Sequence, residues 1–246
     1  MCWSIWAVPA NMWSTLLWLR TTPRGQDEGL STLRHIALEG PIGVGKTTLA
    51  RRLSVALSAS LLLEAPGDNP FLARFYNDPE AWALPTQLTF LLQRMRQARE
   101  LGQRDLFSPR LISDFLVDKD CLFAQLTLAS DQLALYQQLY DELLEGVPAP
   151  DLVIYLHAPI PVLLERINRR AIDYEQTIEA NYLERLCILY AEFFAVYEAA
   201  PVIVVDTVNL NFSTSDRALN ELLALFDEPF QKRRHLAAGA DSDWWS

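Results

Sequence analysis

The segment HIALEGPIGVGKTT, residues 35–48, constrains this chain more than any other part of its sequence. It matches the pattern G-x-x-x-x-G-K-[ST] at Gly40, Gly45, Lys46 and Thr47. An apolar run precedes the motif and the helix-forming segment LARRLSVAL follows it, which predicts a strand, a loop and a helix in that order. Such a loop turns its backbone N–H groups towards phosphates, and the helix N-terminus adds partial positive charge. The segment therefore predicts a nucleoside triphosphate site.

Individual roles follow from the chemistry of the loop. The ammonium of Lys46 is expected to reach the outer phosphates of ATP, and the hydroxyl of Thr47 to join the shell of Mg²⁺. The loop alone does not separate a kinase from an ATPase or GTPase. The chain contains no Asn-Lys-x-Asp guanine motif and no run of four apolar residues ending in an acidic pair. The predicted cofactor-binding residues are Gly40, Pro41, Ile42, Gly43, Val44, Gly45, Lys46, Thr47 and Thr48.

Short apolar runs alternate with long helical patterns from about residue 34 onward. The runs are rich in Leu or β-branched residues and mostly apolar on both faces, as buried parallel strands are. Helical patterns lie between them, including Leu84–Leu101 and Ile178–Tyr197. The alternation predicts an α/β fold with a five-stranded parallel sheet flanked by helices. The predicted strands are His35–Leu38, Leu61–Leu63, Leu111–Ile112, Leu152–Leu156 and Val202–Val205.

Length and composition limit the possible functions. A chain of 246 residues fits one large α/β domain or two small ones, and an apolar fraction of 50% is ample for a core. The net charge of −10 argues against binding to a nucleic acid polymer. Cys2, Cys121 and Cys187 are odd in number and far apart, so they form no disulfide framework or metal cluster. This pattern fits a reducing cytoplasm.

The two ends of the chain differ from the middle. Residues 1–19 are rich in Trp and Leu without a charge, which allows a signal peptide or a membrane anchor. The alternative is a disordered or misassigned leader, because the usual basic start is missing and Pro9 interrupts the apolar run. We expect an unstructured or misassigned leader over residues 1–32, a folded domain over 33–228 and a disordered tail over 229–246.

Five sequence blocks follow one another in order from Leu33 to Thr207: EGPIGVGKTT, LLLEAPGDNPFLARFYNDPEAWALPTQ, LISDFLVDKDCLFA, PDLVIYLHAP and RINRRAIDYEQTIEANYLERL. Together they resemble the deoxynucleoside kinase family, which includes deoxyadenosine, deoxyguanosine and deoxycytidine kinases. The resemblance implies a P-loop kinase fold with a short lid, and transfer of the ATP γ-phosphate to the 5′-hydroxyl of a deoxynucleoside in nucleotide salvage. It also implies a cytoplasmic homodimer without stable membrane association.

Glu64 closes the second predicted strand, at the sheet edge where open α/β folds bind ligands. The family resemblance implies that it deprotonates the nucleoside 5′-hydroxyl. An alcohol is a poor nucleophile until a positioned base takes its proton, so the chemistry needs such a group. The alternative is a surface glutamate or one that caps a helix.

The resemblance also implies residues that hold the acceptor. Tyr76 and Glu175 match positions that bind the sugar 3′-hydroxyl, and Gln87 matches the amide that pairs with the base edge. An amide suits that task because it carries a donor and an acceptor side by side. Arg94 matches an arginine near the base, and its spacing of seven from Gln87 places both on one helix face. The alternative for these two is a solvated helix face.

Arg166 and Arg170 lie four residues apart on the helix expected after the fourth strand, and the following AIDYEQ resembles the lid of the family. Arginines at such a place neutralise the charge that spreads over the transferred phosphoryl group, so both are candidate catalytic residues. The alternative is a solvated basic helix end, which also suits the helix dipole.

The segment Ser113-Asp114-Phe115 departs from the acidic-Arg-Ser triplet of the family. Asp114 stands either where the arginine belongs or, after a shift of one residue, as the acidic member that serves Mg²⁺ or the 5′-hydroxyl. Lys119 is a candidate for the missing positive charge, and Ile172 replaces a common lid arginine. These departures resemble a bacterial branch of deoxyadenosine and deoxyguanosine kinases, which favours purine substrates.

Two other functions compete with this interpretation. A thymidylate-like nucleoside-monophosphate kinase usually has an Asp-Arg pair after the third strand, which is absent here, whereas Glu64 is present. A non-catalytic relative that serves as an assembly subunit need not keep Lys46, Thr47, Glu64 and Glu175 together. Retention of these four residues favours the active kinase.

Overall fold

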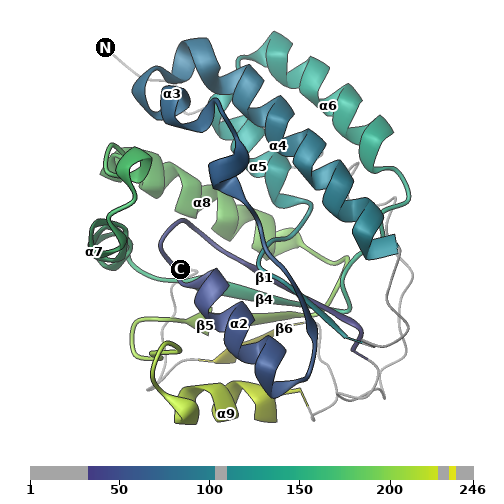
Figure 1. Cartoon of the computed structure of the whole chain (residues 1–246), viewed down its shortest axis with the longest axis vertical. Coiled ribbons are helices and arrows are strands. Elements are labelled where there is room, and N and C mark those ends of the chain that lie inside the picture. Colours follow the sequence, from purple (N-terminus) through teal and green to yellow (C-terminus); the bar gives the residue numbers. More distant parts are fainter. Residues whose placement is uncertain (1–32, 103–109, 227–232, 237–246) are drawn as a thin grey trace.

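The parallel sheet predicted from the sequence is present. The computed structural model describes residues 33–102, 110–226 and 233–236. Over these residues the strands form one parallel sheet in the order β2-β3-β1-β4-β5-β6, with helices on both faces (Figure 1). The strands are β1 (His35–Glu39), β2 (Ser60–Leu62), β3 (Leu111–Ser113), β4 (Leu152–His157), β5 (Val202–Asp206) and β6 (Arg233–Leu236).

The described part of the sheet has six strands where the sequence predicted five. The additional strand, β6, lies within residues 229–246, which we expected to be a disordered tail, so that prediction is wrong for residues 233–236. Its backbone pairs with β5 from Val202–Arg233 to Val205–Leu236. The pattern RRHL hides the strand because an edge strand needs no continuous apolar run, and Leu236 alone packs against the main core.

Helices connect the strands and cover both faces of the sheet (Figure 1). The two long helical patterns are confirmed, since the first lies within α4 and the second extends only one or two residues beyond each end of α8. The helices are α2 (Lys46–Ala56), α3 (Leu72–Asn77), α4 (Pro79–Gly102), α5 (Lys119–Thr127), α6 (Ser130–Leu144), α7 (Ile160–Arg170), α8 (Ala180–Val196) and α9 (Asp216–Ala224), with short 3-10 turns η3 (Pro66–Asp68) and η4 (Asp173–Glu175).

Alternate residues of the central strands enter two separate cores. Leu152, Ile154 and Leu156 of β4 pack with residues of α2 and α9 on one face. Val153 and Tyr155 of the same strand pack with residues of α8 on the other face. Burial of each such side chain contributes about 1.5–3 kcal/mol, so packing on both faces stabilises the sheet. The carboxyl edge of the sheet takes no part in this packing and is available for a binding site.

A third core joins α3, α4, α5 and α6 beyond the face that α8 covers. Its buried side chains include Leu72, Leu91, Ala124 and Tyr136, one from each of these helices. Phe115, just after β3, packs into the same cluster and connects it to the sheet. This helical layer places α3, α4 and α5 beside the carboxyl ends of β1, β2 and β3.

The predicted leader, residues 1–32, lies outside the described residues. Within the part that the structure describes, no helix combines the length and the apolar character needed to cross a bilayer.

Candidate active site

A cavity of about 840 Å³ lies at the carboxyl ends of the strands. The loop after β1, helix α7 and residues 207–213 line one end, and residues of α3, α4, α5 and α8 line the other. Gly40, Pro41 and Arg94 are not among the lining residues. The predicted site residues that line the cavity are Ile42, Gly43, Val44, Gly45, Lys46, Thr47, Thr48, Glu64, Tyr76, Gln87, Asp114, Arg166, Arg170 and Glu175.

Gly40 allows the chain to leave β1 and form the phosphate loop. Its φ is 147°, and a Cβ at this position would lie 2.2 Å from the carbonyl oxygen of Leu156. Any larger residue would therefore force β4 away from the loop. The loop then enters α2 through Gly45, whose left-handed backbone leaves the first N–H groups of the helix free to face a phosphate.

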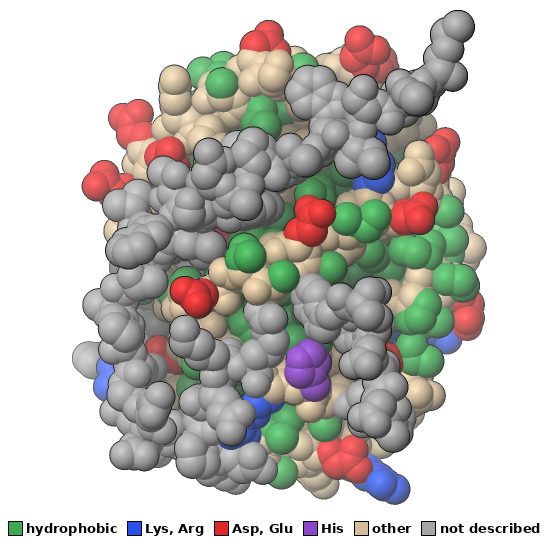
Figure 2. Space-filling model, turned by 180° about the vertical axis from the view of Figure 1, so that it is seen from behind, with side chains coloured by type: hydrophobic (Ala, Val, Ile, Leu, Met, Phe, Trp, Pro, Cys, Tyr) green, Lys and Arg blue, Asp and Glu red, His purple; other side chains and the backbone are tan. Residues whose placement is uncertain are grey.

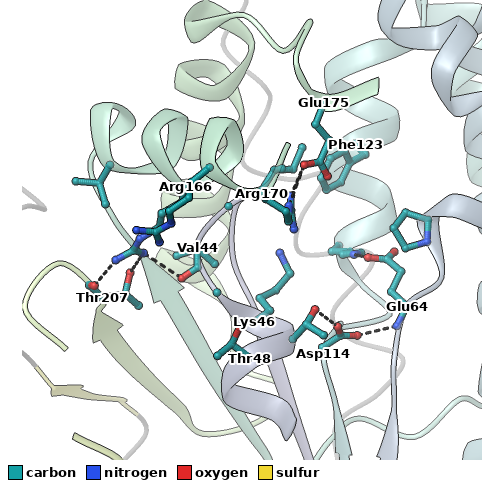
Figure 3. Close-up of a pocket in the computed structure, with 18 of the residues that line it drawn as sticks. Val44, Lys46, Thr48, Glu64, Asp114, Phe123, Arg166, Arg170, Glu175 and Thr207 are labelled. Atoms are coloured by element: carbon teal, nitrogen blue, oxygen red, sulfur yellow. Dashed lines mark hydrogen bonds and ion pairs between the residues drawn. The ribbon is translucent and has the colours of Figure 1, made fainter. Parts of the chain in front are cut away.

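Lys46 lies across the loop that it follows. Its Nζ donates to the carbonyl oxygens of Gly40 at 2.5 Å and Pro41 at 3.2 Å. Burial lowers the pKa of this ammonium, while the carboxylate of Glu39 opposes that shift. The side chain is placed between the loop and the centre of the cavity (Figure 3).

Asp114 connects the phosphate loop to the neighbouring strand. Its Oδ2 accepts a hydrogen bond from the Thr47 hydroxyl at 2.6 Å, and its Oδ1 accepts one from the backbone N–H of Glu64 at 2.7 Å (Figure 3). Of the two alignments that the sequence allowed, this geometry agrees with Asp114 as the acidic member after the third strand. The carboxylate fixes the distance between the loop and Glu64.

Glu64 lies two residues beyond β2 and faces two cations. Its Oε1 accepts from Nη2 of Arg94 at 2.7 Å, and its Oε2 accepts from Nζ of Lys119 at 2.6 Å. Burial by itself would raise the pKa of this carboxyl, but the two ion pairs outweigh burial and hold it well below its usual range. Glu64 is therefore an ionised carboxylate in the cavity wall, and neither a plain surface residue nor a helix cap.

Arg94 lies behind Glu64, away from the cavity that was expected to hold the base. Its side chain is only 1% exposed, which excludes the solvated helix face. The guanidinium donates to Asp120 through Nε at 3.2 Å and Nη2 at 3.1 Å, and to Gln97 through Nη1. It also lies 4.0 Å from the ring centroid of Phe115. Arg94 thus orients Glu64 and Asp120, and its predicted contact with substrate remains a prediction.

Gln87 is buried in the cavity wall, so it too is no solvated helix residue. The Thr127 hydroxyl donates to the carbonyl of Phe123 at 2.7 Å, so towards Gln87 it acts as an acceptor. Nε2 of Gln87 donates to it at 3.2 Å. This arrangement turns the amide nitrogen towards Thr127 and leaves Oε1 as the acceptor for a ligand.

Tyr76 and Glu175 line the same cavity from distant segments of the chain. The ring of Tyr76 on α3 stacks on Tyr174 of η4 with centroids 6.2 Å apart, and Tyr182 meets its edge. Burial raises the pKa of the Tyr76 hydroxyl, and nearby groups that include Glu175 raise it further. Tyr76 is therefore a neutral hydrogen-bonding group beside an anionic one.

The two predicted lid arginines differ in their partners. Arg170 pairs with Glu175, and both side chains face the cavity (Figure 3). Arg166 donates to the hydroxyl of Thr207 at 2.8 Å, to the Thr207 carbonyl at 2.6 Å and to the Val44 carbonyl at 3.2 Å. Arg166 thus joins the phosphate loop to the segment after β5. The side chain of Arg170 is 44% exposed at the end of α7, but its ion pair with Glu175 joins this helix end to the lid.

The sequence interpretation missed two buried carboxylates next to this site. Glu39, the last residue of β1, accepts from the N–H of Gly40 at 2.8 Å and from the N–H of Leu116 at 2.7 Å. Asp120 accepts from Arg94 and lines the cavity. A charged residue within or just after an otherwise apolar strand was the available signal for Glu39. The sequence suggested Lys119 as a candidate for the missing positive charge, and in the structure its ammonium pairs with Glu64.

Comparisons with known proteins agree with this site. The profile described as "Deoxynucleoside kinase" matches residues 36–230. A deoxyguanosine kinase of Bacillus subtilis is 36% identical over 182 residues, which cover 73% of this chain and 88% of the relative. A deoxyadenosine kinase of Lactobacillus acidophilus is 28% identical over 81% of this chain and 98% of its own.

A solved structure gives the same result for the fold. The deoxyadenosine kinase of M. mycoides with the products dCMP and dCDP bound aligns with a TM-score of 0.67 and 26% identity. The alignment covers 77% of this chain and 99% of that one. The profile match spans well over half of the chain and follows the blocks on which the resemblance rests. The chain belongs to the deoxynucleoside kinase family.

Proposed function

We propose that this protein transfers the γ-phosphate of ATP to the 5′-hydroxyl of a deoxynucleoside, with purine deoxynucleosides preferred, in nucleotide salvage. One relationship carries the proposal: Asp114 holds the Thr47 hydroxyl through one oxygen and the backbone of Glu64 through the other. A phosphate-binding loop and an ionised carboxylate therefore line the same cavity in fixed positions. This is the arrangement that in-line transfer to an alcohol requires.

The proposed reaction begins at the acceptor hydroxyl. Glu64 takes the proton of the 5′-hydroxyl as the oxygen bonds to the γ-phosphorus. The bond between that phosphorus and the bridging oxygen to the β-phosphate breaks, and ADP leaves with the electron pair. Lys46 and Arg170 balance the charge that spreads over the transferred group, as predicted for them. Arg166 holds the phosphate loop against Thr207, and these contacts support its proposed catalytic role beside the donor.

Mg²⁺ fits the residues at the start of α2. Because the Thr47 hydroxyl donates a hydrogen bond to Asp114, its oxygen keeps lone pairs for a hard cation. Among the described residues no group of three or more His, Cys, Asp or Glu side chains is placed to hold a metal. Mg²⁺ would therefore take most of its ligands from the nucleotide phosphates and water, as it commonly does. Bound there, the ion would neutralise charge on the β- and γ-phosphates.

The acceptor end of the cavity suits a deoxynucleoside. Tyr76 and Glu175 are proposed to hold the sugar 3′-hydroxyl, and the Oε1 atom of Gln87 to accept from the base edge. Relatives named as deoxyguanosine and deoxyadenosine kinases support the purine preference. A thymidylate-like kinase is disfavoured, because the phosphate that its monophosphate acceptor already carries would meet the carboxylate of Glu64.

We further propose a cytoplasmic homodimer whose catalytic domain spans residues 33–228. The net charge of −10 supports a small-molecule acceptor and no nucleic acid polymer as partner.

A transfer assay tests the function directly. Purified protein is incubated with γ-labelled ATP and Mg²⁺ against the four deoxynucleosides, thymidine monophosphate and a control without acceptor. Labelled deoxyguanosine or deoxyadenosine monophosphate is the expected product, and Lys46→Ala should abolish it. Labelling of thymidine monophosphate alone would instead support the monophosphate kinase. Hydrolysis without transfer would support neither kinase.

A further inference from the structure

Glu64 is paired at both carboxylate oxygens, which is an unfavourable state for a base. A carboxylate whose lone pairs are engaged by two cations binds a proton weakly. If Glu64 accepts the proton of the acceptor alcohol, one of its two partners has to withdraw before or during transfer.

Arg94 is fixed. Its guanidinium is held by Asp120 and Gln97 as well as Glu64, and it packs on the ring of Phe115. It is absent from the cavity wall. Movement of this group would leave Asp120 as a buried and unpaired carboxylate, which is strongly unfavourable. Arg94 therefore stays with Glu64 throughout.

Lys119 is the cation that can leave. Its ammonium lines the cavity, and among the described residues it donates to Glu64 alone, at 2.6 Å. An ammonium has three donors on a flexible four-carbon stem, so two N–H groups remain available for another acceptor. Phe123, whose ring centroid lies 5.9 Å from Nζ, provides an apolar and weakly attractive wall along which the group can shift.

Lys119 lines the same cavity as Lys46 and the phosphate loop. Burial lowers the pKa of Lys46, the carboxylate of Glu39 opposes that shift, and the positive charge of Lys119 adds to it. Both also interact with the buried carboxylate of Glu39. A phosphoryl group lying between Lys46 and Glu64 would meet the Lys119 ammonium on its acceptor side.

We propose that Lys119 is a further catalytic residue, whose ammonium moves from Glu64 to the phosphoryl group as it is transferred. This proposal rests on the proposed kinase function. The ammonium keeps its proton throughout: it exchanges one anionic partner for another and forms no covalent bond. Its departure frees one oxygen of Glu64 to take the proton of the 5′-hydroxyl. The base is thus released only when the donor phosphate is in place.

Steady-state kinetics of Lys119→Met and Lys119→Arg test the proposal. Methionine keeps the apolar stem without the charge. We expect kcat to fall by about 10²–10³, the usual cost of losing one donor to a transition-state oxygen, while the KM for deoxyguanosine changes little. Arginine should restore kcat to within about tenfold of wild type, because it returns a donor and a charge. Arg217→Met, which removes an exposed charge of α9, is the matched control and should act like wild type.

A second measurement separates a contact with phosphate from an effect through Glu64. In the Glu64→Gln background, Lys119→Met should lower kcat by at least a further factor of about ten if the ammonium stabilises the phosphoryl group. No further loss would mean that Lys119 acts only on Glu64 and would overturn the proposal. A lower melting temperature with equal losses in kcat and affinity for ATP would overturn it as well. Absence of transfer by the wild-type protein would refute the kinase function itself.

Discussion

The hydroxyl of Tyr190 on α8 donates a hydrogen bond of 3.0 Å to Glu39, the last residue of β1, across 151 residues of chain. The same carboxylate accepts from the N–H groups of Gly40 and Leu116. Glu39 is completely buried. Burial raises its pKa, and the charges of Lys119 and Lys46 oppose that shift. One carboxylate therefore joins the phosphate loop, the segment that leads to Lys119, and the helix that covers the sheet.

Removal of the Tyr190 hydroxyl should lower the stability of the folded protein slightly, and alteration of Glu39 should lower it more. Tyr190→Phe should lower the free energy of unfolding by about 0.5–1.5 kcal/mol, the usual net value of one hydrogen bond. Glu39→Gln should cost about 1–3 kcal/mol, because the amide NH₂ cannot accept from a backbone N–H and leaves that donor unsatisfied. Urea denaturation of both variants provides the measurement. A Glu39→Gln protein as stable as wild type would show that the second acceptor oxygen is dispensable.

Loss of the base at Glu64 should separate binding from chemistry. Glu64→Gln keeps the shape of the side chain but cannot take a proton, so turnover should fall by about 10²–10⁴. The affinity for ATP should stay nearly unchanged, because the loop residues that hold the phosphates are intact. Rapid-quench measurement of phosphate transfer and titration with a nucleotide analogue give the two quantities. Unchanged turnover would remove Glu64 from the mechanism.

The ion pairs of Glu64 should also make stability depend on pH. Burial would raise the pKa of this carboxyl, but Lys119 and Arg94 lower it in the folded protein, while the unfolded chain keeps a value of about 4.3. Below that value the unfolded chain binds a proton that the folded protein does not, so the stability contributed by Glu64 is present at neutral pH and declines as the pH falls. The difference in unfolding free energy between wild type and Glu64→Gln should shrink from about pH 6 to about pH 3.5. A difference that is constant over this range would contradict the ion pairs.

Asp114→Asn should change the dependence on magnesium. The new amide can still accept from the N–H of Glu64, but its NH₂ faces the Thr47 hydroxyl, which then has to accept and loses a lone pair for the metal. Residues that orient a metal ligand typically contribute about 10–100-fold to metal affinity or activity. The Mg²⁺ concentration for half-maximal activity should rise by such a factor. Thr47→Ser, which keeps the hydroxyl, is the control and should stay close to wild type.

Local patterns in the sequence were sufficient for much of this molecule. All five predicted strands, the helix after the phosphate loop, and helices α4 and α8 were predicted correctly, because these depend on near neighbours and on the periodicity of apolar residues. The family was identified from the five sequence blocks that resemble it. The cavity is lined by Glu64, Tyr76, Gln87 and Glu175, whose roles in catalysis and substrate binding stay predictions. Strand β6 was missed because an edge strand is held by backbone hydrogen bonds and leaves little pattern in its side chains.

The sequence by itself determined that this chain folds as a parallel α/β protein around a phosphate-binding loop. Only the tertiary structure decided which charges meet beside that loop. Arg94 and Lys119 reach Glu64 from 30 and 55 residues away, and both contacts exist because α4 and α5 pack over the carboxyl ends of β2 and β3. In a buried site the partner of each charge sets its pKa and its freedom to move. Such partners depend on packing across the whole fold, which no local pattern records.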